Sequence, residues 1–196
     1  MGGPDHALIP LDQGHAAGAS MGRGAAGGPA YSGAATALLA DLIARDGAAW
    51  ARQASLSMAP LIQPGDAVRL VPLDRGQIAR GSLIAYRREE MLVVHRLLAW
   101  GEAGVVTKGD ALTSPDPLVA WEQVVAQVAA LRRTGKPPAD LGAFPWPFIN
   151  GILSAVSAIA SRLSAENGTG ERRPFLPRLT WKALRIPFYL ARCLLP

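Results

Sequence analysis

Six short β-prone segments, separated by turn residues, follow one another through the middle of this chain and constrain its fold most strongly. They cover residues 50–55, 67–71, 83–87, 91–100, 104–108 and 124–132. Segments of this length and spacing are typical of antiparallel sheets, and residues 88–90 have the composition of a hairpin tip. We therefore expect a mainly β fold, a small and strongly bent antiparallel β-domain with one core.

Segments of different character flank the β-rich region. Residues 1–33 are rich in Gly, Ala and Pro and have no apolar period, which predicts a disordered tail and not a secretory signal peptide. Apolar residues at helical spacing over 34–45 predict a packing helix that ends at Asp46-Gly47. The expected organisation is a tail (1–33), a leading helix with the β-domain (34–132), a linker (133–143) and a helical region (144–196).

The region after the linker is apolar without being a convincing membrane span. Residues 141–161 carry no charge, but prolines at 145 and 147 break the front of the stretch. The helical remainder is only about 24 Å long, short of a hydrocarbon core of about 30 Å. One polar stripe, made by Asn150, Ser154, Ser157 and Ser161, indicates an amphipathic helix instead.

The end of the chain is basic and aromatic. From Arg162 onward there are seven basic and two acidic residues, interleaved with Phe, Trp and Tyr. This pattern favours peripheral contact with an anionic membrane surface. It leaves open which side of the membrane is contacted, and the cytoplasmic side is one alternative. Packing of these helices on the β-domain is the next alternative, and no nucleic-acid partner is expected.

Ser57 is a candidate nucleophile. It lies in the stretch of residues 55–66, where a β-prone run ends and a Pro-Gly-Asp turn leads into the next strand. A serine at such a strand end can present its hydroxyl to a cleft, while Pro60 and Pro64 stiffen the backbone. Because a free serine hydroxyl is a poor nucleophile, this interpretation requires a base and oxyanion donors. Taken alone, an ordinary strand-end hydroxyl is the simpler interpretation of Ser57.

His95 is the candidate base. Alternation along a strand places it on the face of Val93 and Leu97, and an imidazole on an apolar face tends to stay neutral, the form that accepts a proton. Two carboxylates that could orient this imidazole follow, Asp110 and Asp116. Either of them could instead make a simple Asx turn.

Taken together, these blocks resemble the type I signal peptidase superfamily. The motifs are Ser-x-Ser-Met-x-Pro with a Pro-Gly-Asp turn, Gly-x-Leu-x-x-Tyr, Val-Val-His-Arg, and Thr-Lys-Gly-Asp with a second Asp six positions on. They occur in order over about residues 48 to 130, half of the chain. They are most similar to the archaeal and endoplasmic-reticulum branch, in which histidine stands where most bacterial enzymes have lysine.

The resemblance implies a role for each matching residue. Ser57 would be the nucleophile, His95 the general base and Asp116 the favoured acidic partner, with Asp110 in the neighbouring Gly-Asp turn. The backbone N–H of Ser57 and the hydroxyl of Ser55 would hold the oxyanion.

Four further positions bear on the implied site. Met58 and Pro60 would belong to the substrate cleft and its turn. Lys108 is a rival base by chemistry, but its place beside the Gly-Asp turn argues against it. Leu56 occupies a position that is often glycine in this superfamily, which leaves the oxyanion geometry open.

The implied function is that of a serine endopeptidase that cleaves a peptide or preprotein after small residues through an acyl-enzyme. A typical signal peptidase also places a transmembrane helix before its serine, and no such segment is expected here. Two alternatives remain, a non-catalytic membrane-surface or partner-binding module, and a self-cleaving repressor-type protease. The second uses a lysine base and a helix-turn-helix domain, and neither is visible.

No cofactor or metal is expected from the sequence. The single Cys193 and the widely separated His6, His15 and His95 show no metal-ligand spacing. No glycine-rich loop of the kind that holds phosphate follows a strand.

Overall fold

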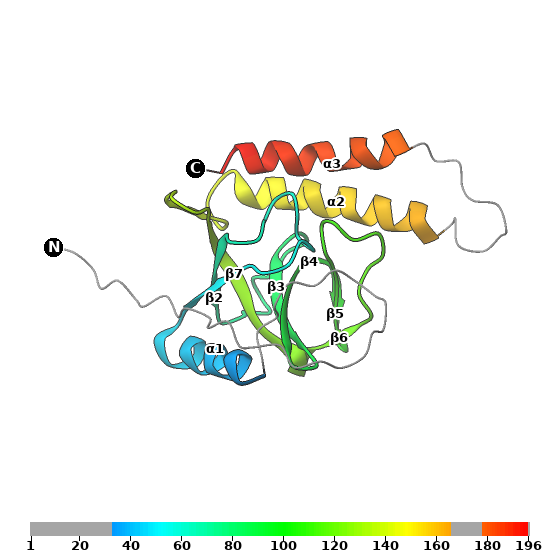
Figure 1. Cartoon of the computed structure of the whole chain (residues 1–196). Coiled ribbons are helices and arrows are strands. Elements are labelled where there is room, and N and C mark those ends of the chain that lie inside the picture. Colours follow the sequence, from blue (N-terminus) through cyan, green and yellow to red (C-terminus); the bar gives the residue numbers. More distant parts are fainter. Residues whose placement is uncertain (1–32, 166–177, 196) are drawn as a thin grey trace, which may run out of the picture.

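The computed structural model describes residues 33–165 and 178–195 (Figure 1). The expected disordered tail, apart from its last residue, lies outside this part of the chain. One antiparallel sheet forms the body of the protein, with strand order β1-β2-β7-β3-β4-β5-β6 and with β8 paired to β7. A mainly β, antiparallel fold is thereby confirmed.

The strands are β1 (Ala49–Arg52), β2 (Ala67–Val71), β3 (Leu83–Arg88), β4 (Met91–Gly101), β5 (Gly104–Lys108), β6 (Val119–Ala120), β7 (Val124–Arg132) and β8 (Pro138–Asp140). The helices are α1 (Gly33–Asp46), α2 (Trp146–Ala165) and α3 (Arg178–Cys193), and a 3-10 turn covers Trp121–Gln123. Strand β8 lies inside the segment expected as a linker. It is only three residues long and begins with proline, so it carries no periodic signal.

The sheet bends because its strand pairing is interrupted in three places. The register shifts between Arg69 and Leu70, between Ala85 and Tyr86, and between Leu97 and Ala99. Such irregularities increase the local twist and curl a sheet. Two clusters of apolar side chains pack, one on each face of the sheet, in place of the single core that we expected.

Helix α1 ends where the sequence predicts. Gly47 adopts a φ of +74°, and its N–H donates to the carbonyl of Ile43 at 3.0 Å. A glycine at this position closes a helix without the steric penalty that a side chain would bring. Leu39 and Ile43 are buried, so the helix packs on the sheet as expected.

Helix α2 lies against β4, and α3 lies beside α2, on the side of the molecule away from α1 (Figure 1). The polar stripe of α2 faces inward, since Asn150, Ser154 and Ser157 are buried. Its apolar Phe148 and Ile159 are exposed instead. This is the reverse of the usual amphipathic helix, and the polar groups beneath α2 explain it, as described below. Among the described residues, no helix is both long and apolar enough to cross a membrane.

Candidate functional site

Strands β4 and β5 divide their polar residues between the two faces of the sheet. His95 and Arg96 are neighbours on β4 and therefore point to opposite faces. Across the strand pair, Arg96 lies opposite Lys108 and Leu97 lies opposite Thr107. Thr107 accordingly shares the face of His95, and Lys108 shares that of Arg96. Each face carries its own polar cluster.

The first cluster surrounds His95, which is buried. Its Nδ1 lies 2.6 Å from Oδ2 of Asp116, and the Thr107 hydroxyl donates to the same oxygen at 2.8 Å. Arg88 donates to the other carboxylate oxygen at 2.7 Å and to the Tyr86 hydroxyl at 2.7 Å. The N–H of Asp116 also donates to the carbonyl of Thr107, which ties this carboxylate to the end of β5. Asp116 thus holds the imidazole, and Arg88 and Thr107 in turn hold the carboxylate of Asp116.

The hydrogen bonds in this cluster decide which nitrogen of His95 faces Asp116. Burial by itself would raise the pKa of Asp116, but hydrogen bonds from His95, Arg88 and Thr107 hold that pKa well below its usual range. An ionised carboxylate only accepts hydrogen bonds, so Nδ1 of His95 carries the proton that joins them. In the neutral imidazole, Nε2 then has a free lone pair. Burial and the charge of Asp116 raise the pKa of Tyr86, which keeps its phenol neutral.

Ser57 lies in a loop that is fastened beside this imidazole. The carbonyl of Ser57 accepts a hydrogen bond from the N–H of Ala111 at 2.8 Å. A Cβ built on Gly109 would lie 2.7 Å from that carbonyl oxygen and 3.0 Å from Nε2 of His95. The backbone of Ser57 and the free nitrogen of His95 therefore meet at one point, and only a glycine leaves room there.

The hydroxyl of Ser57 has a different partner. In the part of the chain that the structure describes, Ser57 Oγ is bonded to Ser55 Oγ at 3.1 Å and not to His95. A Ser–His hydrogen bond requires the hydroxyl of Ser57 to donate to Nε2 of His95. Catalytic hydrogen bonds are often long or unformed before a substrate binds.

Ser55 is itself fixed by Gln53. The side-chain amide of Gln53 donates to Ser55 Oγ at 2.9 Å and to the Ser55 carbonyl at 3.2 Å. This bond uses one of the two acceptor lone pairs of the Ser55 hydroxyl and leaves its proton available to donate. Leu56 is 58% exposed, so its side chain points into solvent and away from the two hydroxyls.

The second cluster, on the opposite face, is centred on the ion pair between Arg96 and Asp110. The guanidinium makes two parallel bonds to the carboxylate, of 2.8 and 2.7 Å, and both side chains are fully buried. Arg96 also donates to Asn150 at 2.9 Å and to the Gly81 carbonyl at 3.0 Å. Ser154 donates to the carbonyl of Leu97 at 3.0 Å. These bonds are the reason that the polar stripe of α2 faces the sheet.

Of the two candidate carboxylates, the structure brings only Asp116 to His95. Asp110 was the alternative, but it binds Arg96 on the other face and does not orient the imidazole. Lys108 is also on that face, where its Nζ lies 3.5 Å from Ser157 Oγ.

Met58 and Pro60, expected in the substrate cleft and its turn, lie in the interior. Both residues are buried, and Met58 belongs to the larger apolar core together with Leu61 and Ile62. The loop turns inward here, because the N–H of Ile62 donates to the carbonyl of Met58 at 3.0 Å. These side chains anchor the Ser57 loop in the core.

Four residues of the site were not singled out from the sequence, namely Gln53, Tyr86, Arg88 and Thr107. Tyr86 and Thr107 belong to motif blocks, so the motifs contained a signal for them. Gln53 precedes Ser55 by two positions but has no distinguishing pattern. Arg88 was assigned to a hairpin tip, and nothing local indicates that it reaches a carboxylate 28 residues away.

No group of three or more His, Cys, Asp or Glu side chains that could hold a metal ion occurs among the described residues. The site is instead a combination of a serine pair, a buried histidine and a strongly ionised carboxylate. No protein-family model and no curated protein matches the sequence.

Proposed function

We propose that this protein is a serine endopeptidase of the signal-peptidase type, with Ser57 as nucleophile and His95 as general base. The observation that carries the proposal is the buried His95–Asp116 pair, whose free Nε2 meets the Ser57 loop at Gly109. A carboxylate held ionised by three donors serves to orient an imidazole and to stabilise its protonated form. The order of the motif blocks along the chain adds to this support.

The proposed reaction has two halves. Ser57 Oγ attacks the carbonyl carbon of the scissile bond while Nε2 of His95 takes the hydroxyl proton. When the C–N bond breaks, that proton passes to the leaving amine, and an ester remains on Ser57. A water molecule then attacks the ester with His95 again as the base, which releases the carboxyl product and restores the hydroxyl.

Charge on the oxyanion is stabilised by two donors in this proposal, the N–H of Ser57 and the hydroxyl of Ser55. Ser55 is suited to this because Gln53 occupies its acceptor side. When the Ser57 hydroxyl turns to His95, the Ser55 proton becomes available to the substrate oxygen. A single donor of this kind typically contributes about 10²- to 10³-fold to the rate.

Cleavage of a peptide with an Ala-x-Ala site tests the proposal, in detergent and in liposomes. We expect Ser57→Ala and His95→Ala each to lower kcat by at least about 10³-fold. Ser161→Ala, on α2, is the matched control and is expected to cleave like the wild type. Equal cleavage by wild type and Ser57→Ala would refute the proposal. No cleavage and no trapped acyl-enzyme with any substrate would favour a non-catalytic binding module.

We also propose that α2 and α3 contact a membrane surface. Large apolar side chains are exposed on both helices, among them Phe148 and Ile152 on α2 and Tyr189 and Leu190 on α3. The sequence from Arg162 onward adds the basic excess that attracts anionic lipid. Exposed apolar residues beside cations are the pattern of helices that lie in the lipid interface.

Sedimentation with vesicles tests this contact. We expect binding to phosphatidylglycerol vesicles to exceed binding to phosphatidylcholine vesicles, and the double variant Phe148→Ser/Ile152→Ser to bind at least about tenfold less. Trp100→Ser is the control, since it removes an exposed apolar side chain from β4. Binding that is unchanged in the double variant would exclude this face of α2.

A further inference from the structure

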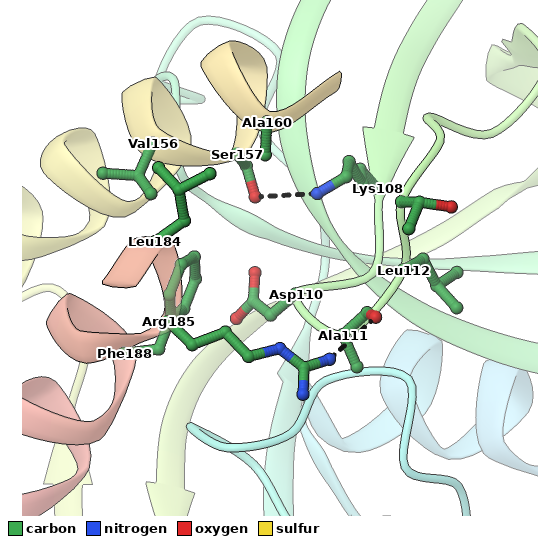
Figure 2. A pocket seen from close by; sticks show the side chains of 11 residues that line it. Lys108, Asp110, Ala111, Leu112, Val156, Ser157, Ala160, Leu184, Arg185 and Phe188 are labelled. Atoms are coloured by element: carbon green, nitrogen blue, oxygen red, sulfur yellow. Dashed lines mark hydrogen bonds between the residues drawn. The ribbon is translucent and has the colours of Figure 1, made fainter. Parts of the chain in front are cut away.

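A cavity of about 240 Å³ lies where the loop after β5 meets α2 and α3, on the face of the sheet opposite His95 (Figure 2). Val156, Ala160, Leu184 and Phe188 give it an apolar wall on the helix side. Its polar groups come from the loop and from both helices. The peptidase mechanism uses none of them.

Lys108 is the unusual group in this cavity. The residue is only 2% exposed, and its ammonium has a single long hydrogen bond, of 3.5 Å, to Ser157. Among the described residues, it forms no ion pair within 4.0 Å, and both oxygens of the nearby Asp110 bind Arg96. Burial lowers the pKa of Lys108, and the charge of Asp110 only partly opposes this effect. The cavity thus contains a buried amine that makes no ion pair with the described residues, although Asp110 lines the same cavity.

A second cation stands beside the same cavity. Arg185 of α3 donates to the carbonyl of Ala111 at 3.0 Å, and Figure 2 shows its side chain extending beneath Asp110 to the loop. Unlike Lys108, Arg185 is exposed to solvent. Two basic side chains, Lys108 and Arg185, thus line the cavity together with one carboxylate, Asp110, which Arg96 already binds.

We propose that this cavity binds a carboxylate that bears a short apolar group. The carboxylate pairs with Lys108, and the apolar group lies against the wall formed by Val156, Leu184 and Phe188. A volume of about 240 Å³ corresponds to about eight water molecules and so to an organic molecule of about that many non-hydrogen atoms. Two sources supply this chemistry, a free short-chain fatty acid and the carboxyl end of a peptide.

Occupancy of the cavity would bear on the Ser57 loop. The N–H of Ala111 holds the Ser57 carbonyl, and its own carbonyl accepts from Arg185. A ligand that attracts Arg185 therefore acts on the same residue that fastens Ser57. The binding site itself does not depend on peptidase activity.

Calorimetric titration of the full chain tests the proposal, with hexanoate for the fatty-acid source and N-acetylalanine for the peptide source. Hexanol is the neutral control ligand. We expect at least one carboxylate to bind with a dissociation constant of about millimolar, as befits so small a ligand, and hexanol to bind at least about tenfold more weakly. The carboxylate that binds more tightly identifies the source.

Two variants locate the binding. Lys108→Met removes the charge while keeping the shape, and Ala160→Leu fills the cavity while keeping the charge. We expect each to weaken carboxylate binding at least about tenfold, whereas Lys136→Met, at an exposed lysine, changes nothing. The proposal is overturned if neither carboxylate binds, if hexanol binds as well as hexanoate, or if Lys108→Met binds like the wild type. Because no turnover is measured, failure here leaves the peptidase proposal untouched.

Discussion

Replacing Asp116 with Asn tests the proposed site most directly. The substitution keeps the size of the side chain but replaces one carboxylate oxygen by an NH₂ group. In the wild type, Oδ2 accepts from both His95 and Thr107, and Oδ1 accepts from Arg88. In asparagine, the amide oxygen can accept hydrogen bonds either from His95 and Thr107 or from Arg88, but not from both sides, because the NH₂ group cannot accept.

The expected loss of activity follows from the tautomer of His95. If the amide NH₂ faces Nδ1, that nitrogen becomes an acceptor and the proton moves to Nε2, where it blocks the acceptance of a proton from Ser57. In serine hydrolases, a change of this kind lowers kcat by about 10⁴-fold, equivalent to about 5 kcal/mol of activation free energy. We expect a loss of this order in kcat, with little change in KM.

Stability should fall as well, and in a pH-dependent way. Breaking a buried ion pair usually costs about 3 to 5 kcal/mol, and the lower end applies because the Arg88 side chain is 39% exposed and can be hydrated again. The folded-state pKa of Asp116 lies below its usual value of 3.8. The stability that ionised Asp116 contributes to the folded state is therefore fully present above pH 3.8 and is lost as pH falls through the folded-state pKa. The stability difference between wild type and variant should be constant near neutral pH and shrink in acid.

The assays are kcat and KM for the peptide and urea unfolding at several pH values. Glu102→Gln, the same carboxylate-to-amide change at an exposed position, is the control and should match the wild type. If Asp116→Asn keeps kcat within tenfold of the wild type while Ser57→Ala is inactive, Asp116 does not orient the base. The proposed Ser–His–Asp arrangement would then be wrong.

Two further substitutions test other parts of the structure. Gly109→Ala places a methyl group against the Ser57 carbonyl and Nε2 of His95, so we expect activity to fall more than about 100-fold. Gly101→Ala, where nothing lies within 4 Å, should retain activity, and equal activity of the two variants would contradict the contact. Lys108→Met removes a buried charge, so urea unfolding should show a gain of about 1 kcal/mol at neutral pH. Because the pKa of Lys108 is lowered on folding, this gain should vanish as pH rises above 10.5, and a gain that is independent of pH would refute its electrostatic origin.

Much of the sheet was predictable because the signals for a β-strand lie in neighbouring residues. Alternation and flanking turns located β2 to β5 and β7, and the same alternation placed His95 on the face opposite Arg96. The first strand was predicted to run to residue 55, but β1 ends at Arg52. The next residue, Gln53, bonds through its backbone to the turn before β2, with its N–H donating to the Asp66 carbonyl and its carbonyl accepting from the Gly65 N–H. Strands β6 and β8 are too short to show a period, and their pairing with longer strands creates them.

The sequence by itself determined the strand pattern and the order of the polar blocks, because both depend on neighbouring residues. Only the tertiary structure decided which carboxylate meets His95. Asp110 and Asp116 lie in one connection, and the register of β4 against β5 sends the first to Arg96 and the second to His95. Tertiary packing also buried Met58 and turned the polar stripe of α2 inward, since buried Arg96 needs partners that water cannot supply.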